Sequence, residues 1–171
     1  VVRHMYPDAD IPVLQLSLDY TMGAEAHFKL AEELAFLRNK GVLIIGSGNI
    51  IHNLRQVRFG RSFGLEDYGY DWAIEFNELL KKNITDKNHA ALINYPALGK
   101  AAFLAIPSPD HYIPMLYALA LQDSQDQISL FNDKLVAGSL NMTSFSISRN
   151  TISHNTPDVP GKDTANAMDS L

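Results

Sequence analysis

His52 stands where the sequence predicts an active site. It comes three residues after the turn Gly46-Ser47-Gly48-Asn49, which ends a short apolar run. In an open parallel sheet, ligands bind beyond the carboxyl ends of the strands. An imidazole at that place can bind a metal through one ring nitrogen, or act as an acid or base near neutral pH. The local pattern fits equally well a structural histidine at a helix start, hydrogen-bonded to a nearby carbonyl group.

His111 is the second candidate, because it follows Pro109-Asp110 at the start of a predicted helix. The neighbouring carboxylate can orient the imidazole and raise its basicity. Aspartate at a helix start is, however, chiefly a capping residue, and the local pattern alone leaves both interpretations open. Gly46-Ser47-Gly48 is not a phosphate-binding loop, since the third glycine and the lysine of such loops are absent.

Four further histidines are interpreted as structural. His4 and His154 are expected to be exposed near the two ends of the sequence, His27 to lie at the surface or boundary of a helix, and His89 to lie in a polar loop. The sequence contains no cysteine, which excludes disulfides and thiolate metal sites. Any metal must therefore be held by His, Asp or Glu.

The leading part of the chain has the pattern of a strand–helix–strand unit. Residues 11–18 and 42–45 are apolar and rich in strand-forming residues, which predicts two buried strands. Residues 24–40 are amphipathic at helical spacing, and Gly41 is predicted to end that helix. Two strands joined in this way are predicted to be parallel neighbours with a right-handed crossover.

The rest of the chain alternates between helix and strand patterns and then becomes polar. Helices are predicted over residues 70–83, 89–95 and 111–121, strands over 127–131 and 142–147, and a disordered tail over 150–171.

Composition narrows the class of protein. A chain of 171 residues that is 46% hydrophobic can form one domain with a core. The net charge is −5 and the basic residues are scattered, which argues against nucleic acid as a partner. No apolar run reaches the roughly 20 residues that cross a bilayer, so no membrane association and a cytoplasmic location are expected.

Four segments resemble, in order, signatures of the DOPA extradiol dioxygenase family. They are residues 5–13 (MYPDADIPV), 46–55 (GSGNIIHNLR), 107–114 (PSPDHYIP) and 138–144 (GSLNMTS). This family belongs to the class III extradiol dioxygenases, which are related to the catalytic subunit of protocatechuate 4,5-dioxygenase. The resemblance covers residues 1–149 and implies an α/β fold with a mixed, largely parallel central sheet flanked by helices.

The resemblance also implies a reaction. Dioxygen opens the ring of a catechol, such as 3,4-dihydroxyphenylalanine, beside its two hydroxyl groups. The reaction takes place at a single divalent metal, which is Zn²⁺ in some relatives and is expected to be Fe²⁺ for turnover. The resemblance implies that His52 is a metal ligand or the acid/base next to the metal, and that His111 is a second catalytic histidine near the substrate. No separate cofactor-binding residues are implied.

The sequence departs from the family pattern in its histidines. The resemblance implies that residues 1–149 are the C-terminal portion of the catalytic domain, and that an N-terminal portion with two metal-binding histidines is missing from this incomplete fold. We therefore expect the fragment alone to be inactive, to need that missing portion as its partner, and to be able to form oligomers. The alternatives are a non-enzymatic binding or signalling protein on the same scaffold, or a degenerate reading frame.

Overall fold

The computed structural model describes residues 2–60 and 66–149. The helices are α1 (Val2–Met5), α2 (Ala24–Glu32), α3 (Asp71–Thr85), α4 (His89–Ile93), α5 (Lys100–Ala105) and α6 (Ile113–Ala120). The strands are β1 (Gln127–Phe131), β2 (Leu135–Val136), β3 (Leu140–Asn141) and β4 (Ser144–Ser148), and 3-10 helices span Ala35–Lys40, Leu54–Gln56 and Tyr95–Leu98.

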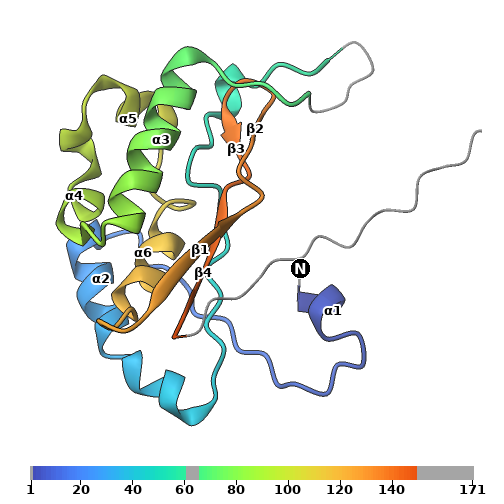
Figure 1. Ribbon diagram of the computed structural model, residues 1–171, viewed down its shortest axis with the longest axis vertical. Helices are drawn as coiled ribbons and strands as arrows, with labels where there is room; N and C mark the ends of the chain where they lie inside the picture. The colour runs from blue at the N-terminus through green and yellow to red at the C-terminus, as the bar shows by residue number, and fades with distance from the viewer. Residues whose placement is uncertain (1, 61–65, 150–171) are drawn as a thin grey trace, which may run out of the picture.

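The core lies among the helices. In α3 the buried apolar residues Ala73, Phe76, Leu80 and Ile84 recur every three or four positions and form one face. Helix α6 is apolar nearly all round because α2 and α4 both pack against it. Figure 1 shows these helices on one side of the molecule, the strands beside them and α1 apart from the body.

The strands form two small antiparallel sheets. Strand β1 pairs with β4 along its whole length, and β2 pairs with β3 in a tight hairpin. The chain turns between β2 and β3 at Ala137 and Gly138, both with positive φ angles. At Gly138 a side chain would also collide with the ring of Tyr70, so glycine is required there for two reasons.

The later predictions agree well with the structure. The helices predicted over 70–83, 89–95 and 111–121 correspond to α3, α4 and α6, and the strand predicted over 127–131 is β1. The final strand, Ser144–Ser148, begins two residues later and ends one residue later than predicted. The helix predicted over 24–40 is α2 followed by a 3-10 helix, and it ends at Gly41 as expected.

The mixture of helices and strands is confirmed, but the largely parallel sheet is wrong. Residues 11–18 and 42–45 are extended but are not strands, because no neighbouring strand pairs with them within residues 2–60 and 66–149. The strand–helix–strand unit is therefore absent from the described part of the chain. The predicted tail, residues 150–171, and His154 lie outside the described residues.

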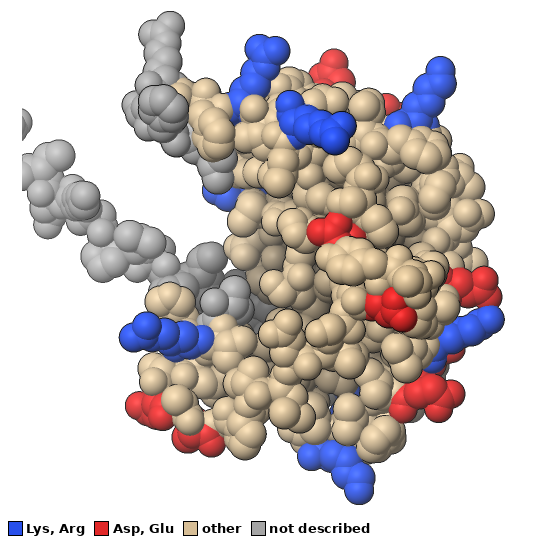
Figure 2. Space-filling view, turned by 180° about the vertical axis from the view of Figure 1, so that it is seen from behind, with Lys and Arg blue, Asp and Glu red and all other residues tan. Residues whose placement is uncertain are grey.

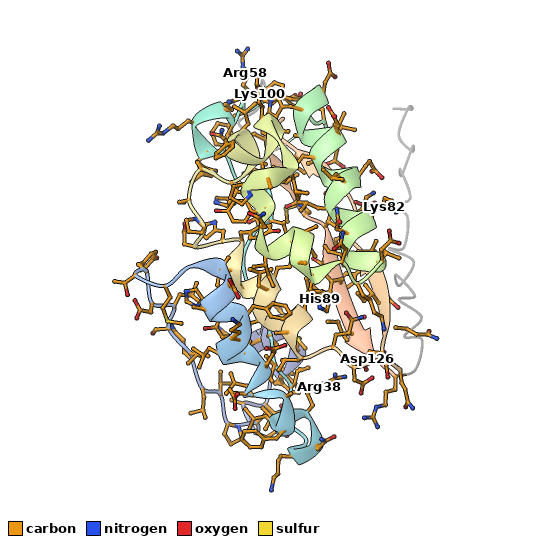
Figure 3. All side chains as sticks on the ribbon, turned by 90° about the vertical axis from the view of Figure 1, so that its left-hand side faces the viewer. Arg38, Arg58, Lys82, His89, Lys100 and Asp126 are labelled. Carbon is orange, nitrogen blue, oxygen red and sulfur yellow. The ribbon has the colours of Figure 1, made fainter. Side chains whose placement is uncertain are left out.

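One ion pair fastens the leading half of the chain to the trailing half. The Arg38 guanidinium donates to both carboxylate oxygens of Asp126, at 2.5 and 2.8 Å, and to the carbonyl oxygen of Leu121. Figure 3 shows Arg38 and Asp126 lying close together at the lower end of the molecule. The Asp126 side chain is fully buried.

Every helix in the described residues is too short or too polar to span a membrane.

Candidate active site

Two glycines bring the His52 turn against the start of α6. A side chain at Gly46 would collide with the backbone of Pro114, and one at Gly48 would collide with the backbone of His111. The Gly-Ser-Gly sequence therefore permits a close approach of two backbones. As a result, His52 and His111 lie side by side although 59 residues separate them: their ring centroids are 4.9 Å apart, with the ring planes inclined by 52°.

The backbone at His52 is fixed from two sides. Its N–H donates to the carbonyl oxygen of Ala105, the last residue of α5, at 2.9 Å. On the other side, the Asn53 N–H donates to the Ser139 carbonyl oxygen, and the Ser139 hydroxyl donates back to the Asn53 carbonyl oxygen at 2.8 Å. These bonds hold the imidazole in place without using the imidazole itself.

Asn141 completes the support from within the protein. Its side-chain oxygen accepts the N–H of Ile51 at 2.9 Å, and its amide nitrogen donates to Asn77 on α3. Asn141 is only 1% exposed. A buried polar side chain satisfied at both ends specifies one geometry, so the position of His52 relative to α3 is set by this residue.

The His52 ring has one engaged nitrogen and one free nitrogen. Nε2 lies 2.9 Å from the carbonyl oxygen of Ser108. A carbonyl oxygen only accepts, so Nε2 carries the proton and Nδ1 of the neutral ring has an open lone pair. Nδ1 is buried and makes no hydrogen bond to the described residues. A buried acceptor without a partner is rare and points to a ligand or a proton-transfer role.

Burial keeps the His52 ring neutral. Loss of solvent lowers the pKa of His52, and the nearby His111 acts in the same direction. The carbonyl group of Ser108, the Asn49 backbone and Asp110 oppose this effect without reversing it. The ring is therefore a base at neutral pH.

His111 is the open member of the pair. Its side chain is 47% exposed, and its Nε2 lies 3.5 Å from a carboxylate oxygen of Asp110. The Ser108 side chain is the main cause that lowers the pKa of Asp110, so this carboxylate stays charged beside His111. An imidazole with one face in solvent and an anion next to it can accept a proton from a bound molecule.

The donor set is of the right type for a divalent metal but too small. His52, His111 and Asp110 offer nitrogen and oxygen donors, and the unpartnered Nδ1 of His52 suits one metal bond. Within residues 2–60 and 66–149, however, no group of three His, Asp or Glu side chains is arranged to hold an ion. The described residues therefore do not make a metal site by themselves.

The other histidines among the described residues have structural partners or lie at the surface, but His27 was predicted wrongly. It is 1% exposed, with Nδ1 3.0 Å from the Tyr117 hydroxyl and Nε2 3.0 Å from the Asp19 carbonyl oxygen. The Asp19 carbonyl group in the segment before α2 and the Tyr117 hydroxyl on α6 thus each contact one ring nitrogen. His89 begins α4, not a loop, and contacts the Gln122 side chain, whereas His4 is exposed as predicted.

Asn141, Ser108 and Ser139 were missed in the sequence. Each is a small polar residue inside a motif that was noted for other reasons: Ser108 in PSPDH and the other two in GSLN. Ser139 and Asn141 lie in a short apolar hairpin, and both are buried. Polar residues in such a position are a signal for a hydrogen-bonded support.

Comparison with known proteins relates the chain to dioxygenases. It is 39% identical over 150 residues to a protein of Escherichia coli K12 named 4,5-DOPA dioxygenase extradiol, covering 86% of this chain and 54% of that protein. It is 30% identical over 141 residues to a Beta vulgaris protein of the same name, covering 82% of this chain and 51% of that one. The chain thus spans about half the length of the curated relatives it matches.

A solved structure supports the same relation. The crystal structure of an uncharacterized Escherichia coli K12 protein matches with a TM-score of 0.75 and 40% identity, over 84% of this chain and 58% of that one. No family model matches the chain. At this level of identity the likeness extends to sequence as well as fold.

Proposed function

Because the chain belongs to the family of the 4,5-DOPA extradiol dioxygenases, we propose that it supplies the His52–His111 pair to the cleavage of a catechol ring by dioxygen. The observation that carries the proposal is the 4.9 Å approach of the two rings. The two histidines come from separate segments, and a Gly-Ser-Gly turn is required to bring them together.

The pair divides the acid–base work between an open and a closed imidazole. His111 faces solvent and is the group that a catechol meets first. An imidazole nitrogen takes the proton of a catechol hydroxyl, which leaves a catecholate and an imidazolium. Asp110 lies beside His111 and stabilises that imidazolium. The buried, neutral ring of His52 is the second base, and the bond from its Nε2 to the Ser108 carbonyl oxygen orients the open Nδ1.

The proposed reaction requires a divalent metal, Zn²⁺ or Fe²⁺. The described residues provide at most a few of its ligands, with His52 as the first candidate, so any remaining ligands must come from elsewhere. The choice of 3,4-dihydroxyphenylalanine as substrate is likewise a proposal, which rests on the names of the relatives.

The test is a chimera in which this chain replaces the matching 150 residues of the Escherichia coli relative. The protein is prepared without oxygen, loaded with Fe²⁺ and mixed with 3,4-dihydroxyphenylalanine and air. Oxygen uptake and the yellow semialdehyde product are then measured. We expect turnover, a loss of about 100-fold or more for His52→Ala, and a smaller loss for His111→Ala.

His89→Ala is the matched control, since His89 lies on α4 away from the pair, and this variant should keep full activity. A folded chimera that is inactive while the Escherichia coli protein turns over would refute the proposal for this chain. Full activity of His52→Ala would refute the role of His52. A folded, inactive chimera that binds catechols would support the binding-protein alternative instead.

A further inference from the structure

A chain of hydrogen-bonded polar side chains connects the surface to the His52 turn. At its inner end, Asn141 accepts the Ile51 N–H, and its amide nitrogen donates to Asn77 on α3 at 3.2 Å. The amide nitrogen of Asn77 donates in turn to Oδ1 of Asp133, also at 3.2 Å. Asn77 and Asn141 are both buried, so solvent is largely excluded from these bonds. Asp133, in the loop between β1 and β2, is thus connected to the candidate site through two side chains.

The bonds of this chain all have the same direction. A carboxylate only accepts hydrogen bonds, whereas an asparagine side chain has a donor end and an acceptor end. Because Asp133 only accepts, Asn77 must turn its nitrogen toward Asp133 and its oxygen toward Asn141. Asn141 must then turn its nitrogen toward Asn77, which leaves its oxygen for the Ile51 N–H. Reversal of the Asn77 amide would place two donors face to face on one side and two acceptors on the other, which is costly inside a protein.

Donors meet Asp133 from two sides, and only a carboxylate satisfies both. Its Oδ1 accepts from Asn77 and from the buried Thr143 hydroxyl at 3.0 Å, and its Oδ2 accepts from the Lys81 ammonium group at 2.5 Å. An asparagine has one oxygen and one NH₂ group. At this position its oxygen can serve the buried donors or Lys81, and its NH₂ group then faces a donor on the other side. The charge of Asp133 therefore has a geometric role.

An ion pair for stability does not explain this arrangement. Lys81 also pairs with Glu78 at 2.7 Å, and the Asp133 side chain is 38% exposed, so the Lys81–Asp133 pair contributes little to stability. Figure 2 shows one face of the molecule on which charged side chains lie mainly toward the rim, with a few acidic groups nearer the centre. Asp133 differs from an ordinary surface carboxylate because one of its oxygens bonds to buried groups. Burial raises the pKa of Asp133, but its hydrogen bonds lower it below the ordinary value, so the anion persists at neutral pH.

We propose that Asp133 is a positioning residue of the candidate site: its inward oxygen sets the direction of the Asp133–Asn77–Asn141 chain and thereby fixes the backbone at His52. The carbonyl oxygen of Asn141 also accepts from the Asn49 side chain at 2.5 Å, so the turn is held at two points. The proposal rests on the proposed function, because His52 requires a fixed position only if its ring meets a substrate.

NMR and amide hydrogen exchange on the full chain test the positioning without metal or catechol. In Asp133→Asn, exchange of the Ile51 amide should become faster by about tenfold or more, because the Asn77 amide is no longer held in one direction. The signal of the His52 ring N–H, which bonds to the Ser108 carbonyl oxygen, should shift as well. The amides of α6 report on the fold and should keep their protection.

A second substitution separates the direction of the chain from the charge. Lys81→Met removes the outer donor, so the asparagine of Asp133→Asn can turn its oxygen inward and its NH₂ group to solvent. The double variant should therefore bring Ile51 exchange back to within about threefold of the wild-type rate. Lys81→Met alone is the matched control, since it removes the ion pair but leaves the inward oxygen in place, and it should leave Ile51 exchange unchanged.

Three results would overturn the proposal: unchanged Ile51 exchange in Asp133→Asn, no recovery in the double variant, or an equal acceleration in Lys81→Met alone. If Asp133→Asn also loses the protection of α6, the double variant decides: recovery of both regions supports the proposal, and no recovery overturns it.

The chimera with the Escherichia coli relative tests the consequence for the reaction. In it, Asp133→Asn should lower kcat by about tenfold with little change in KM, and adding Lys81→Met should restore kcat. An unchanged kcat in an active chimera whose Ile51 exchange is faster would refute the positioning role. An inactive wild-type chimera would refute the proposed function instead, and the exchange rates of the chain alone would still stand.

Discussion

Helices α3 and α6 and the extended residues 11–18 and 42–45 are all rich in apolar residues, yet only the helices form the elements that their patterns predict. In α3 and α6 every turn makes its own backbone hydrogen bonds, and packing then buries one face of α3 and most of α6. In residues 11–18 and 42–45 the backbone needs a neighbouring strand, which the described residues do not provide. Apolar pattern therefore specifies a helix locally, but it specifies a strand only together with its neighbour.

If the two regions differ as described, a leucine in α6 should contribute far more to stability than a leucine in residues 11–18. Leu116 on α6 is fully buried and Leu14 is 96% exposed. We expect Leu116→Ala to lower the free energy of unfolding by about 2–5 kcal/mol, because it leaves a cavity in the core. Leu14→Ala should change it by less than about 0.5 kcal/mol. Urea unfolding followed by tryptophan fluorescence measures both, and a large effect of Leu14→Ala would show that this segment already packs on the body.

The ion pair between Arg38 and Asp126 tests how firmly the leading half is attached to the body. Asp126→Asn leaves the guanidinium without its anion, and Arg38 is partly exposed, so we expect a loss of about 2–3 kcal/mol at pH 7. Thermal unfolding of the two proteins gives the difference.

The same pair predicts a pH dependence. The Arg38 guanidinium holds the pKa of Asp126 below its ordinary value, although burial opposes this. An unfolded aspartate titrates near pH 3.9, so below about that pH the unfolded state takes up the proton first. The stabilisation is thus complete above about pH 4 and is lost as the pH falls through the pKa of the folded state. The difference in the free energy of unfolding between wild type and Asp126→Asn should therefore become smaller only in acid. A difference that becomes smaller between pH 8 and 6 would contradict this assignment.

The smallest expected effect on stability is at Asn141 of β3, which joins the His52 turn to α3. Asn141→Ala removes the acceptor of the Ile51 N–H and the donor to Asn77, and we expect a loss of about 1–2 kcal/mol. Exchange of the Ile51 amide should become faster, while the exposed Asn39→Ala serves as a control without effect. Slow exchange of the Ile51 amide in Asn141→Ala would mean that the His52 turn is held in some other way.

The sequence predicted elements best where they depend on local spacing. The apolar period of α3, the Pro-containing start of α6 and the alternation in β1 are all local signals. Helix α5 was missed because it is only six residues long, and the β2–β3 hairpin because each strand has two residues. The two strands predicted over residues 11–18 and 42–45 are wrong, because a strand also requires a pairing partner and local spacing does not reveal that partner.

For the candidate site, the sequence indicated the two histidines but not how they meet. Their approach depends on backbone contact at Gly46 and Gly48, which the Gly-Ser-Gly pattern suggested only as a turn. The buried supports from Asn141 and Ser139 come from about 90 residues away, where no spacing rule connects them with His52. The catalytic roles of His52 and His111 stay predictions.

Buried His27 links the segment before α2 to α6. Its Nε2 donates to the carbonyl oxygen of Asp19, which directly follows residues 11–18, and its Nδ1 accepts from the hydroxyl of Tyr117 on α6. Helix α6 begins two residues after His111. We therefore expect a change at His27 to alter the position of α6 and, with it, the surroundings of His111. Replacement of His27 by Gln should shift the NMR signals of the His111 ring, and unchanged signals would show that the two residues are independent.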